Sequence, residues 1–231
     1  MKEKILIVDD EKEIADLLEL YLGNDGYEVY KFYNGSDAWD CLTQTPIDLA
    51  LLDIMLPDMD GFALCRKIRE QWYFPIIMLT ARTEASDKIQ GITMGADDYI
   101  TKPFHPLEVI ARVRAQLRRM QDYNSRLPRK QEQEIYDIHG LELNVDMHTC
   151  TLYGESVTLT PIEFSIVHYL CSKKGSVVSS EELFEQVWGE KYLDSNNTIM
   201  AHIAKIREKF HENSRKPKFL KTVWGVGYKI E

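Results

Sequence analysis

The hydrophobic residues of the first 120 positions fall into short continuous runs separated by longer amphipathic segments. The runs are ILIV at 5–8, YEVYKF at 27–32, IDLALLD at 47–53, PIIML at 75–79 and DDYI at 97–100. Strands that are apolar on both faces and separated by helix-length crossovers are typical of a parallel sheet. Helices are expected at about 11–22, 34–44, 60–71, 84–94 and 105–119. The pattern therefore predicts an α/β domain of five βα units.

The residues after position 134 follow a different pattern. Short alternating pieces at 135–159 are punctuated by Gly140, Asn144 and Gly154, which indicates a small antiparallel sheet. Three helices are expected next, from Thr160-Pro161 to about 172, from a serine cap at 179 or 180 to about 188, and over 195–211. FLKTV, WGVG and YKI then form a closing hairpin. Three helices with a β-ribbon predict an α+β winged-helix module.

A polar segment separates the two patterns. QDYNSRLPRKQEQE, at 121–134, shows neither helical nor strand periodicity and contains Pro128, which is typical of a tether. We therefore expect a first domain over 1–120, a linker over 121–134 and a second domain over 135–231.

Charge divides the chain in the same way. The whole sequence carries 28 basic and 37 acidic side chains, a formal net charge of −9. Residues 1–120 hold 14 basic and 21 acidic residues, net −7, whereas 205–231 hold 8 and 3, net +5. The basic end of an acidic chain keeps a nucleic-acid partner open for the second module.

Composition excludes several classes of protein. No apolar run reaches the roughly 18–20 residues of a membrane-spanning helix, because Asp9, Asp48 and Asp53 interrupt the best candidates. The N-terminal MKEKILIVDDE has no small-residue cleavage site, so a signal peptide is excluded and a cytoplasmic location without membrane contact is expected. The four cysteines form no C-x-x-C pair, which argues against a zinc site or a disulfide framework.

Four of the predicted strands end in residues that suit phosphate chemistry. The first ends in Asp9-Asp10-Glu11, the third in Asp53, the fourth in Thr80, and the fifth runs into Lys102-Pro103. Ligands of an open parallel sheet bind outside the carboxyl ends of its strands. Crowded carboxylates repel one another unless a divalent cation holds them, and an all-oxygen ligand set favours Mg²⁺. With Lys102 and Thr80 as phosphate-binding groups, Asp53 is the candidate nucleophile for an aspartyl phosphate.

Longer motifs around these residues match a known family. ILIVDDE, LLDIMLPDMDG, IIMLTA and GADDYITKPF resemble the receiver domains of two-component response regulators, and LTPIEF and KTVWGVGYKI resemble winged-helix output domains of the OmpR/PhoB type. The resemblance covers essentially the whole chain. It implies a flavodoxin-like, CheY-like receiver with a five-stranded doubly wound parallel sheet, joined to a winged-helix DNA-binding domain. EIADLLELYL, SNNTI and TVWGVGYKIE are further similar to the vancomycin-resistance branch of the family.

The resemblance implies a role for each acid of the first domain. Asp53 is the expected phosphoacceptor. Asp10, Asp53 and the backbone carbonyl of Met55 are the expected Mg²⁺ ligands, and Asp9 is expected to support the metal through water.

The same resemblance implies how phosphorylation is read. Thr80 and Lys102 would bind the phosphoryl oxygens, Tyr99 would turn inward on activation, and the Lys102-Pro103 peptide is expected to be cis. Charged residues of the receiver would pair across a symmetric homodimer that forms on phosphorylation. The expected pairs are Lys88 with Glu108, Asp98 with Arg112, and Asp97 with Arg119. From the charges alone, a solvated surface with weak salt bridges is the simpler interpretation.

The helix expected over 195–211 has two distinct faces. Ile199, Ile203, Ile206 and Phe210 recur at helical spacing and form a narrow stripe that must face the core. The opposite face would present Asn197, Ala201, Ala204, Lys205 and Glu208, with Met200 and Arg207 on its flank. In a winged-helix domain this is the recognition helix.

Residues of this helix and of the closing hairpin suit contacts with duplex DNA. Asn197 can read adenine, Ala201 can contact a thymine methyl group, and Lys205 can bind guanine or phosphate. Thr198 and His202 are placed for phosphate, while basic residues near the hairpin add sequence-independent affinity. The expected contact set is Asn197, Thr198, Ala201, His202, Lys205, Arg207, Lys221 and Trp224. Many relatives carry arginine at the positions of Trp224 and Ala204, which leaves core packing or a backbone contact as alternatives for Trp224.

These features predict a transcription factor switched by phosphorylation rather than an enzyme. A sensor histidine kinase would supply the phosphate, a homodimer would bind promoter DNA, and the loop 187–196 would meet RNA polymerase. Transcription activation, with vancomycin-resistance genes as candidate targets, is expected from the resemblance. One alternative is a Mg²⁺-dependent phosphatase of the haloacid-dehalogenase type, which would need a second aspartate where this chain has Met55. Another is a receiver whose output binds protein or RNA.

Overall fold

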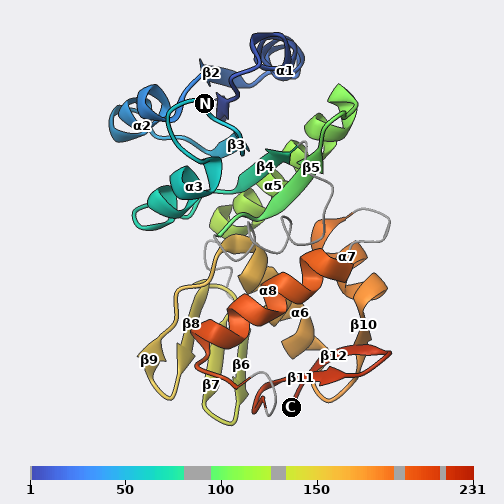
Figure 1. The fold of residues 1–231 in the computed structure, drawn as a ribbon. Coiled ribbons are helices and arrows are strands. Elements are labelled where there is room, and N and C mark those ends of the chain that lie inside the picture. The colour runs from blue at the N-terminus through green and yellow to red at the C-terminus, as the bar shows by residue number, and fades with distance from the viewer. Residues whose placement is uncertain (1, 81–94, 126–133, 190–195, 214–216) are drawn as a thin grey trace. The chain divides into compact units, whose positions relative to one another are not determined.

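The structure is a computed structural model that describes residues 2–80, 95–125, 134–189, 196–213 and 217–231. These residues form two compact units, Met1–Met120 and Gln121–Glu231 (Figure 1). Within the described ranges, no helix combines the length and the hydrophobicity of a membrane span.

The N-terminal unit is built on a parallel sheet with the order β2-β1-β3-β4-β5. Its strands are β1 (Lys4–Val8), β2 (Glu28–Phe32), β3 (Leu49–Asp53), β4 (Ile76–Thr80) and β5 (Asp98–Thr101). Its helices are α1 (Lys12–Asn24), α2 (Gly35–Gln44), α3 (Gly61–Arg69) and α5 (Pro106–Ser125). The predicted doubly wound sheet is confirmed, whereas the helix expected at 84–94 lies outside the described residues.

The continuous apolar runs form the core of this unit. Every residue of β3 and β4 is buried, and Ile5, Leu51 and Ile77 have no exposed surface. Helix α1 covers them with Ala15 and Leu18, in keeping with its amphipathic spacing. Burying one such aliphatic side chain stabilises the fold by about 1.5–3 kcal/mol, so the core holds the strand ends in fixed positions.

Helix α5 is longer than its hydrophobic pattern predicted. We expected it to end near 119, where the apolar positions stop, but it continues to Ser125. The residues that follow the stripe are polar yet compatible with a helix, and Pro128 is the first strong helix breaker after them. The segment expected as a linker over 121–134 therefore begins as helix, and 126–133 lie outside the described residues.

The C-terminal unit contains two antiparallel sheets and three helices. A four-stranded sheet is formed by β6 (Ile135–Ile138), β7 (Leu141–Asn144), β8 (Thr149–Leu152) and β9 (Glu155–Ser156). The helices are α6 (Pro161–Ser172), α7 (Ser180–Trp188) and α8 (Asn196–Lys209). A three-stranded sheet pairs β12 (Gly227–Ile230) with β10 (Val178–Ser179) and β11 (Leu220–Val223). The predicted winged-helix arrangement is confirmed; we call the β11–β12 hairpin, residues 220–230, the wing.

The residues that predicted the starts of α6 and α7 form side-chain caps in the structure. Thr160 and Glu163 form a reciprocal capping box at the start of α6, and Ser179 caps α7 by accepting a hydrogen bond from the Glu182 amide at 3.0 Å. Strand β10 was missed by the sequence pattern because only two residues pair. Its position is fixed by Gly227, where a Cβ atom would lie 1.9 Å from the Val178 carbonyl oxygen.

Candidate functional site

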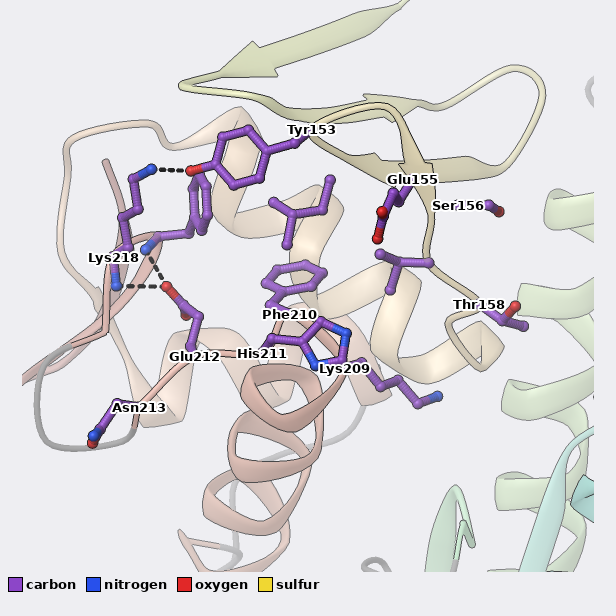
Figure 2. Close-up of a pocket in the computed structure, with 13 residues that line it drawn as sticks. Tyr153, Glu155, Ser156, Thr158, Lys209, Phe210, His211, Glu212, Asn213 and Lys218 are labelled. Carbon is purple, nitrogen blue, oxygen red and sulfur yellow. Dashed lines mark hydrogen bonds between the residues drawn. The ribbon is translucent and has the colours of Figure 1, made fainter.

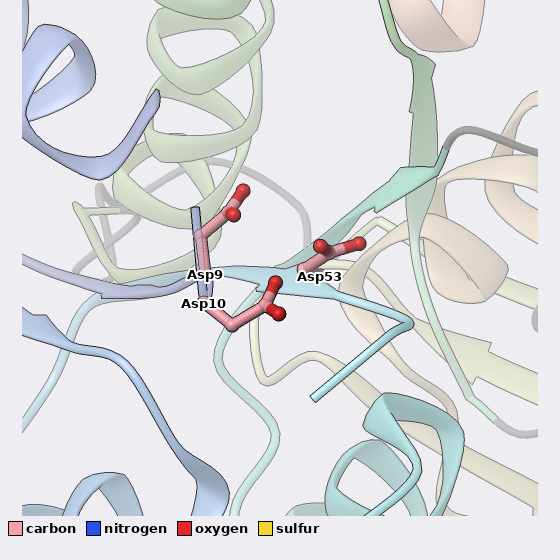
Figure 3. Close-up of side chains that lie close together, drawn as sticks. All are labelled: Asp9, Asp10 and Asp53. Atoms are coloured by element: carbon pink, nitrogen blue, oxygen red, sulfur yellow. The ribbon is translucent and has the colours of Figure 1, made fainter. Parts of the chain in front are cut away.

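Three carboxyl groups meet at the carboxyl edge of the parallel sheet, as the strand ends predicted. Asp9 and Asp10 follow β1, and Asp53 ends the neighbouring strand β3 (Figure 3). One carboxylate oxygen from each lies within 4.8 Å of the others. Asp9 and Asp53 are buried, whereas Asp10 is exposed. Solvent therefore reaches the cluster at Asp10.

Hydrogen bonds to the neighbouring strand and within the loop fix the backbone around the cluster. The Asp9 amide donates to the Phe32 carbonyl oxygen at 3.1 Å, and the Asp9 carboxylate accepts from the Glu11 amide at 3.0 Å. After β3 the chain folds back so closely that a Cβ atom on Gly61 would lie 2.0 Å from the Asp53 carbonyl oxygen. Only glycine fits at that position.

Lys102 supplies the positive charge of the site. Its Nζ lies 2.8 Å from Asp9 Oδ2, 2.9 Å from Asp53 Oδ2 and 2.9 Å from Glu11 Oε1. The Lys102-Pro103 peptide is cis, as expected. Glu11 was noted in the sequence only as part of the acidic strand end, and its contact with Lys102 could not be found without the fold.

Burial and charge act against each other in this cluster. Burial raises the pKa of Asp9 to about 6; Lys102 opposes that shift, and the nearby Asp53 carboxylate adds to it. Burial alone would lower the pKa of Lys102, but hydrogen bonds to the three carboxylates outweigh it and raise that pKa. A single lysine therefore compensates the acids only in part.

The cluster fits a divalent cation by the chemistry of its donors. Three carboxylates within reach of one another offer the hard oxygen ligands that Mg²⁺ prefers, and the exposed Asp10 leaves room for water and phosphate oxygens. Met55, whose backbone carbonyl we expected as a ligand, lies on the β3–α3 loop, where it forms an isolated bridge with Asp60.

Thr80 and Tyr99 lie on the two strands next to the acids. Thr80 ends β4 and is 1% exposed, and its carbonyl oxygen accepts a hydrogen bond from the Lys102 amide at 2.6 Å. Tyr99, on β5, is 7% exposed and therefore lies inward. Burial raises the pKa of its hydroxyl group. Strand pairing thus links Thr80, Tyr99 and Lys102 through adjacent backbone.

The expected dimer face is only partly a surface. Asp97 is fully buried and is bound within its own chain: its Oδ2 accepts from Arg69 Nη2 at 2.6 Å and from the Ile76 amide at 2.8 Å. The prediction that Asp97 pairs with Arg119 of a second copy is therefore wrong for this conformation. Arg69, which the sequence analysis missed, also donates to the carbonyl oxygens of Phe74 and Gly95.

The other residues of that face are placed as follows. Asp98 is 5% exposed and binds Arg112 in the same chain at 3.0 Å, and Arg112 also contacts Glu108 one helical turn away at 3.2 Å. Asp98 and Arg112, which we expected to pair across a dimer, thus form an ion pair within one chain, and their pairing with a second copy stays a prediction. Arg119 is half-buried. Lys88 lies outside the described residues.

Helix α8 presents a different face from the predicted one. The apolar stripe is confirmed, since Ile199, Ile203, Ile206 and Phe210 are 0–2% exposed. However, four expected DNA contacts are also buried: Thr198, Ala201, His202 and Arg207. His202 lies against the indole of Trp188, with ring centroids 5.6 Å apart. The core stripe is therefore wider than four residues.

The exposed side of α8 runs along Met200, Ala204 and Glu208, with Lys205 half-buried beside it. These residues are spaced by one helical turn and form the accessible face. Lys205 remains where the sequence placed it, although its Nζ contacts Glu208 at 2.8 Å. The Asn197 side chain lies outside the described side chains.

Arg207 connects α8 to the wing. Its guanidinium donates to the Leu220 carbonyl oxygen at 3.0 and 2.6 Å and to Thr222 Oγ1 at 2.9 Å. Burial lowers the pKa of this guanidinium. The prediction of a DNA contact is thus corrected to a structural one, in which Arg207 sets the position of β11 relative to α8.

The tip of the wing carries an exposed aromatic side chain. Trp224 is 90% exposed and Val226 is 56% exposed, which excludes the core position considered for Trp224. Together with Met200 they line a groove of about 610 Å³ between α8 and the wing. Lys221, on β11, is half-buried and pairs with Glu231.

A larger cavity, of about 680 Å³, lies at the other end of α8 (Figure 2). It is bordered by the β8–β9 turn and by residues 209–213, and none of the expected DNA contacts lines it. Lys218 bonds to the Tyr153 hydroxyl, and the Glu212 carboxylate accepts hydrogen bonds from the amides of Lys218 and Phe219. These bonds hold the chain as it enters β11.

Both units match known protein families. Residues 5–114 match the response regulator receiver domain, and 154–230 match the C-terminal domain of transcriptional regulatory proteins. The chain belongs to the OmpR/PhoB-type response regulators, in which a receiver domain is joined to a DNA-binding output domain. The predicted family is confirmed. The phosphatase interpretation is not favoured, because both units match regulator domains.

Named relatives cover the whole chain. It is 59% identical over 231 residues to the regulatory protein VanRc of Enterococcus gallinarum, and 54% identical over 232 residues to the regulatory protein VanR of Enterococcus faecium. All of this chain and all of each relative are covered.

Two solved structures share the fold. A mutant of RitR superposes with a TM-score of 0.74 at 26% identity, covering 99% of both chains. DrrB, an OmpR/PhoB homologue from Thermotoga maritima, gives a TM-score of 0.53 at 31% identity and covers 100% of this chain and 99% of its own.

Proposed function

We propose that Asp53 accepts a phosphoryl group from a sensor histidine kinase and that the modified receiver controls DNA binding by the output domain. The observation that carries this proposal is the meeting of Asp9, Asp10 and Asp53 with the Lys102 ammonium group at one sheet edge. A carboxylate held beside a cation-binding acid pair and a fixed positive charge suits attack on phosphorus, since phosphoryl transfer depends on positioning and charge.

The proposed transfer is a substitution at phosphorus. An Asp53 Oδ atom attacks the phosphorus of a phosphohistidine, the O–P bond forms as the N–P bond breaks, and the electron pair leaves with the imidazole. Asp10, Asp53 and the Met55 carbonyl would hold Mg²⁺, with Asp9 supporting it through water, and the cation would supply positive charge to the phosphoryl oxygens. The product adds a charge of about −1.5 to −2 next to Lys102.

This added charge provides the signal. Lys102 Nζ now divides its bonds among three carboxylates, and a phosphoryl group on Asp53 would draw it away from Glu11 and Asp9. The Thr80 hydroxyl would supply a second donor. The change reaches β5 through the backbone bond between Lys102 and Thr80 and through Tyr99 on the same strand.

We further propose that phosphorylation favours a receiver homodimer through α5 and β5. Glu108 lies on the exposed side of α5, and Arg112 lies one turn away. To pair with a second copy, Arg112 would exchange its internal bond to Asp98, so dimer formation and a rearrangement within each receiver would be linked. Asp97 takes no part while Arg69 holds it.

The proposed DNA-binding surface is the exposed side of α8 with the wing. Met200, Ala204 and Lys205 would enter the major groove, and Trp224 at the wing tip would contact the adjacent backbone or minor groove. The net charge of +5 over 205–231 would add affinity that falls with salt. Pairing on tandem half-sites one helical turn apart would strengthen binding.

The identity to VanRc and VanR supports vancomycin-resistance genes as targets. We propose that the protein activates their transcription in the cytoplasm, without enzymatic turnover of an external substrate. Contact with RNA polymerase is proposed for the loop 187–196, most of which lies outside the described residues.

The test is DNA binding to a selected duplex library, with and without a small phosphodonor and Mg²⁺. We expect tighter, cooperative binding of the natural chain only when both are present, and no change for Asp53→Asn. Asp40→Asn, which alters an exposed acid of α2, is the matched control and should behave like the natural chain. Binding that ignores the phosphodonor would refute the switch, and absence of binding in every condition would refute the DNA-binding proposal.

A further inference from the structure

The loop that carries Met55 is tied to a helix outside the acidic cluster. Asp58, on this β3–α3 loop, accepts hydrogen bonds from the Gly35 amide at 2.8 Å, the Ser36 amide at 2.8 Å and the Ser36 hydroxyl at 2.6 Å. Gly35 and Ser36 are the first two residues of α2. The carboxylate thus occupies the amino end of α2, where unpaired amides and the helix dipole favour an anion.

Helix α2 has its own cap in addition to Asp58. Asn34 is its N-cap and accepts a hydrogen bond from the Asp37 amide at 2.8 Å. The loop is pressed onto the same place, because a Cβ atom on Gly35 would lie 2.5 Å from the Met59 side chain. Asn34 therefore stabilises only the helix itself, whereas Asp58 fastens the β3–α3 loop to the helix.

The loop is also closed at its base. Met55 and Asp60 form a bridge, and the Gly61 amide donates to the Ile54 carbonyl oxygen at 2.9 Å. Between these points the chain forms a loop in which Pro57 and Asp58 are exposed, so the core does not hold its tip. The three bonds of Asp58 supply that restraint. Hydrogen bonds from Ser36 and Gly35 lower the pKa of Asp58 to about 2, so the carboxylate stays charged.

We propose that Asp58 is a positioning residue for the cation site: by fastening the β3–α3 loop to α2, it fixes the backbone at Met55, whose carbonyl is the expected ligand two residues after Asp53. This inference rests on the proposed function, because it assumes that Mg²⁺ binds at the acidic cluster. Asp58 itself does not contact the cation or the phosphoryl group. Loss of the fastening would leave the ligand oxygens chemically intact but less well ordered.

The test measures Mg²⁺ affinity of the full chain by calorimetry, together with thermal unfolding. Residues that support metal ligands from outside typically change affinity by 10- to 100-fold when removed, so we expect Asp58→Ala to weaken Mg²⁺ binding about tenfold. Ser36→Ala, which removes one of the three bonds, should give a smaller loss. Asn34→Ala is the matched control: it removes an α2 cap and lowers the unfolding temperature, but should leave Mg²⁺ affinity within about twofold of the natural value.

A second measurement separates positioning from chemistry. With a small phosphodonor, Asp58→Ala should be phosphorylated slowly at low Mg²⁺ and at the natural rate once Mg²⁺ is saturating. Equal Mg²⁺ affinity in Asp58→Ala and the natural chain, or equal weakening in Asn34→Ala, would overturn the proposal. If Asp58→Ala does not fold, Asp58→Asn and Ser36→Ala carry the same comparison. Failure of the natural chain to bind Mg²⁺ would instead refute the cation site of the proposed function.

Discussion

The receiver and the output domain use buried charge in opposite ways. In the receiver, Asp9 and Asp53 share one lysine with Glu11, and burial still leaves Asp9 with a raised pKa. In the output domain, Arg207 is buried as well, but its donors are directed at a carbonyl and a hydroxyl oxygen of β11. In the receiver the negative charge is only partly neutralised, and Lys102 can exchange its carboxylate partners. In the output domain the hydrogen bonds of Arg207 are fixed.

This difference indicates where each domain keeps its function. Groups that repel one another in the folded state weaken the fold until a ligand compensates them, so the receiver site should respond to cations and to pH. The proposed DNA surface consists of exposed side chains such as Trp224 and Ala204, which contribute little to folding. Stability and binding should therefore be linked in the receiver and separable in the output domain.

Removal of Lys102 is the strongest way to test this contrast. Lys102→Ala leaves three carboxylates near one another, two of them buried, without their cation. Breaking one side of a buried ion pair destabilises a protein by about 3–5 kcal/mol, and we expect a loss at the lower end of that range at pH 8. Thermal unfolding with a receiver-specific probe would measure it.

Mg²⁺ should reverse most of this loss, because the cation replaces the missing positive charge. Lys67→Ala, on the exposed side of α3, is the control: Mg²⁺ should stabilise this variant no more than it stabilises the natural chain. A Lys102→Ala chain as stable as the natural one in the absence of Mg²⁺ would contradict incomplete compensation.

The second prediction concerns the pH dependence of receiver stability. The pKa of Asp9 is about 6 in the folded chain and near its ordinary value of 3.8 in the unfolded chain. At a pH between these two pKa values, Asp9 keeps its proton in the folded chain but has lost it in the unfolded chain. The contribution of Asp9 to the unfolding free energy therefore falls as the pH rises. The contribution lost from about pH 4 to above pH 6 is up to about 3 kcal/mol.

This dependence is measured as the difference in unfolding free energy between the natural chain and Asp9→Asn across pH 4–8. The natural chain should lose stability relative to the variant as the pH rises, and Mg²⁺ should reduce the difference by favouring the ionised carboxylate. Parallel curves for the two chains would mean that Asp9 titrates normally.

The acidic site could be predicted from the sequence, while much of the DNA surface could not, and the reason is geometric. A residue such as Asp53 at the end of a buried parallel strand can only lie at the carboxyl edge of the sheet, so strand order brings the acids together. A helix face depends on everything packed around it. Ala201 and His202 lie beside the apolar stripe of α8, and nothing in their spacing showed that the core extends over them.

Internal partners of charged residues were also invisible in the sequence. Asp97 and Arg69 are separated by 28 positions, and their contact follows only from the packing of α3 against the ends of two strands. Asp58, which no sequence pattern singled out, accepts three hydrogen bonds from the first residues of α2. Long-range pairing of this kind requires the tertiary fold.

The third prediction concerns the structural role of Arg207 in the output domain. Arg207→Lys keeps the charge but cannot form the forked contacts with Leu220 and Thr222. We expect a loss of about 1–3 kcal/mol in the unfolding free energy of the output domain, because hydrogen bonds to a buried charged group are removed. DNA affinity should fall as well, since β11 loses its fixed position.

Lys205→Ala is the matched change on the same helix. Lys205 is half-buried and pairs only with the exposed Glu208 among the contacts described for it, so stability should change by less than about 0.5 kcal/mol while DNA affinity falls. If Arg207→Lys lowered DNA affinity without lowering stability, Arg207 would be a DNA contact after all.

Trp224 gives the smallest effect on folding and the clearest separation of folding from binding. Trp224→Ala removes a side chain that is 90% exposed, so the unfolding free energy should stay within about 0.5 kcal/mol of the natural value. DNA affinity should fall, but the slope of log K against log salt should be unchanged, because no charge is lost. Trp224→Arg should restore affinity and steepen that slope by about one unit. Fluorescence anisotropy across a salt series measures both quantities, and natural DNA affinity in Trp224→Ala would show that the wing tip does not take part in binding.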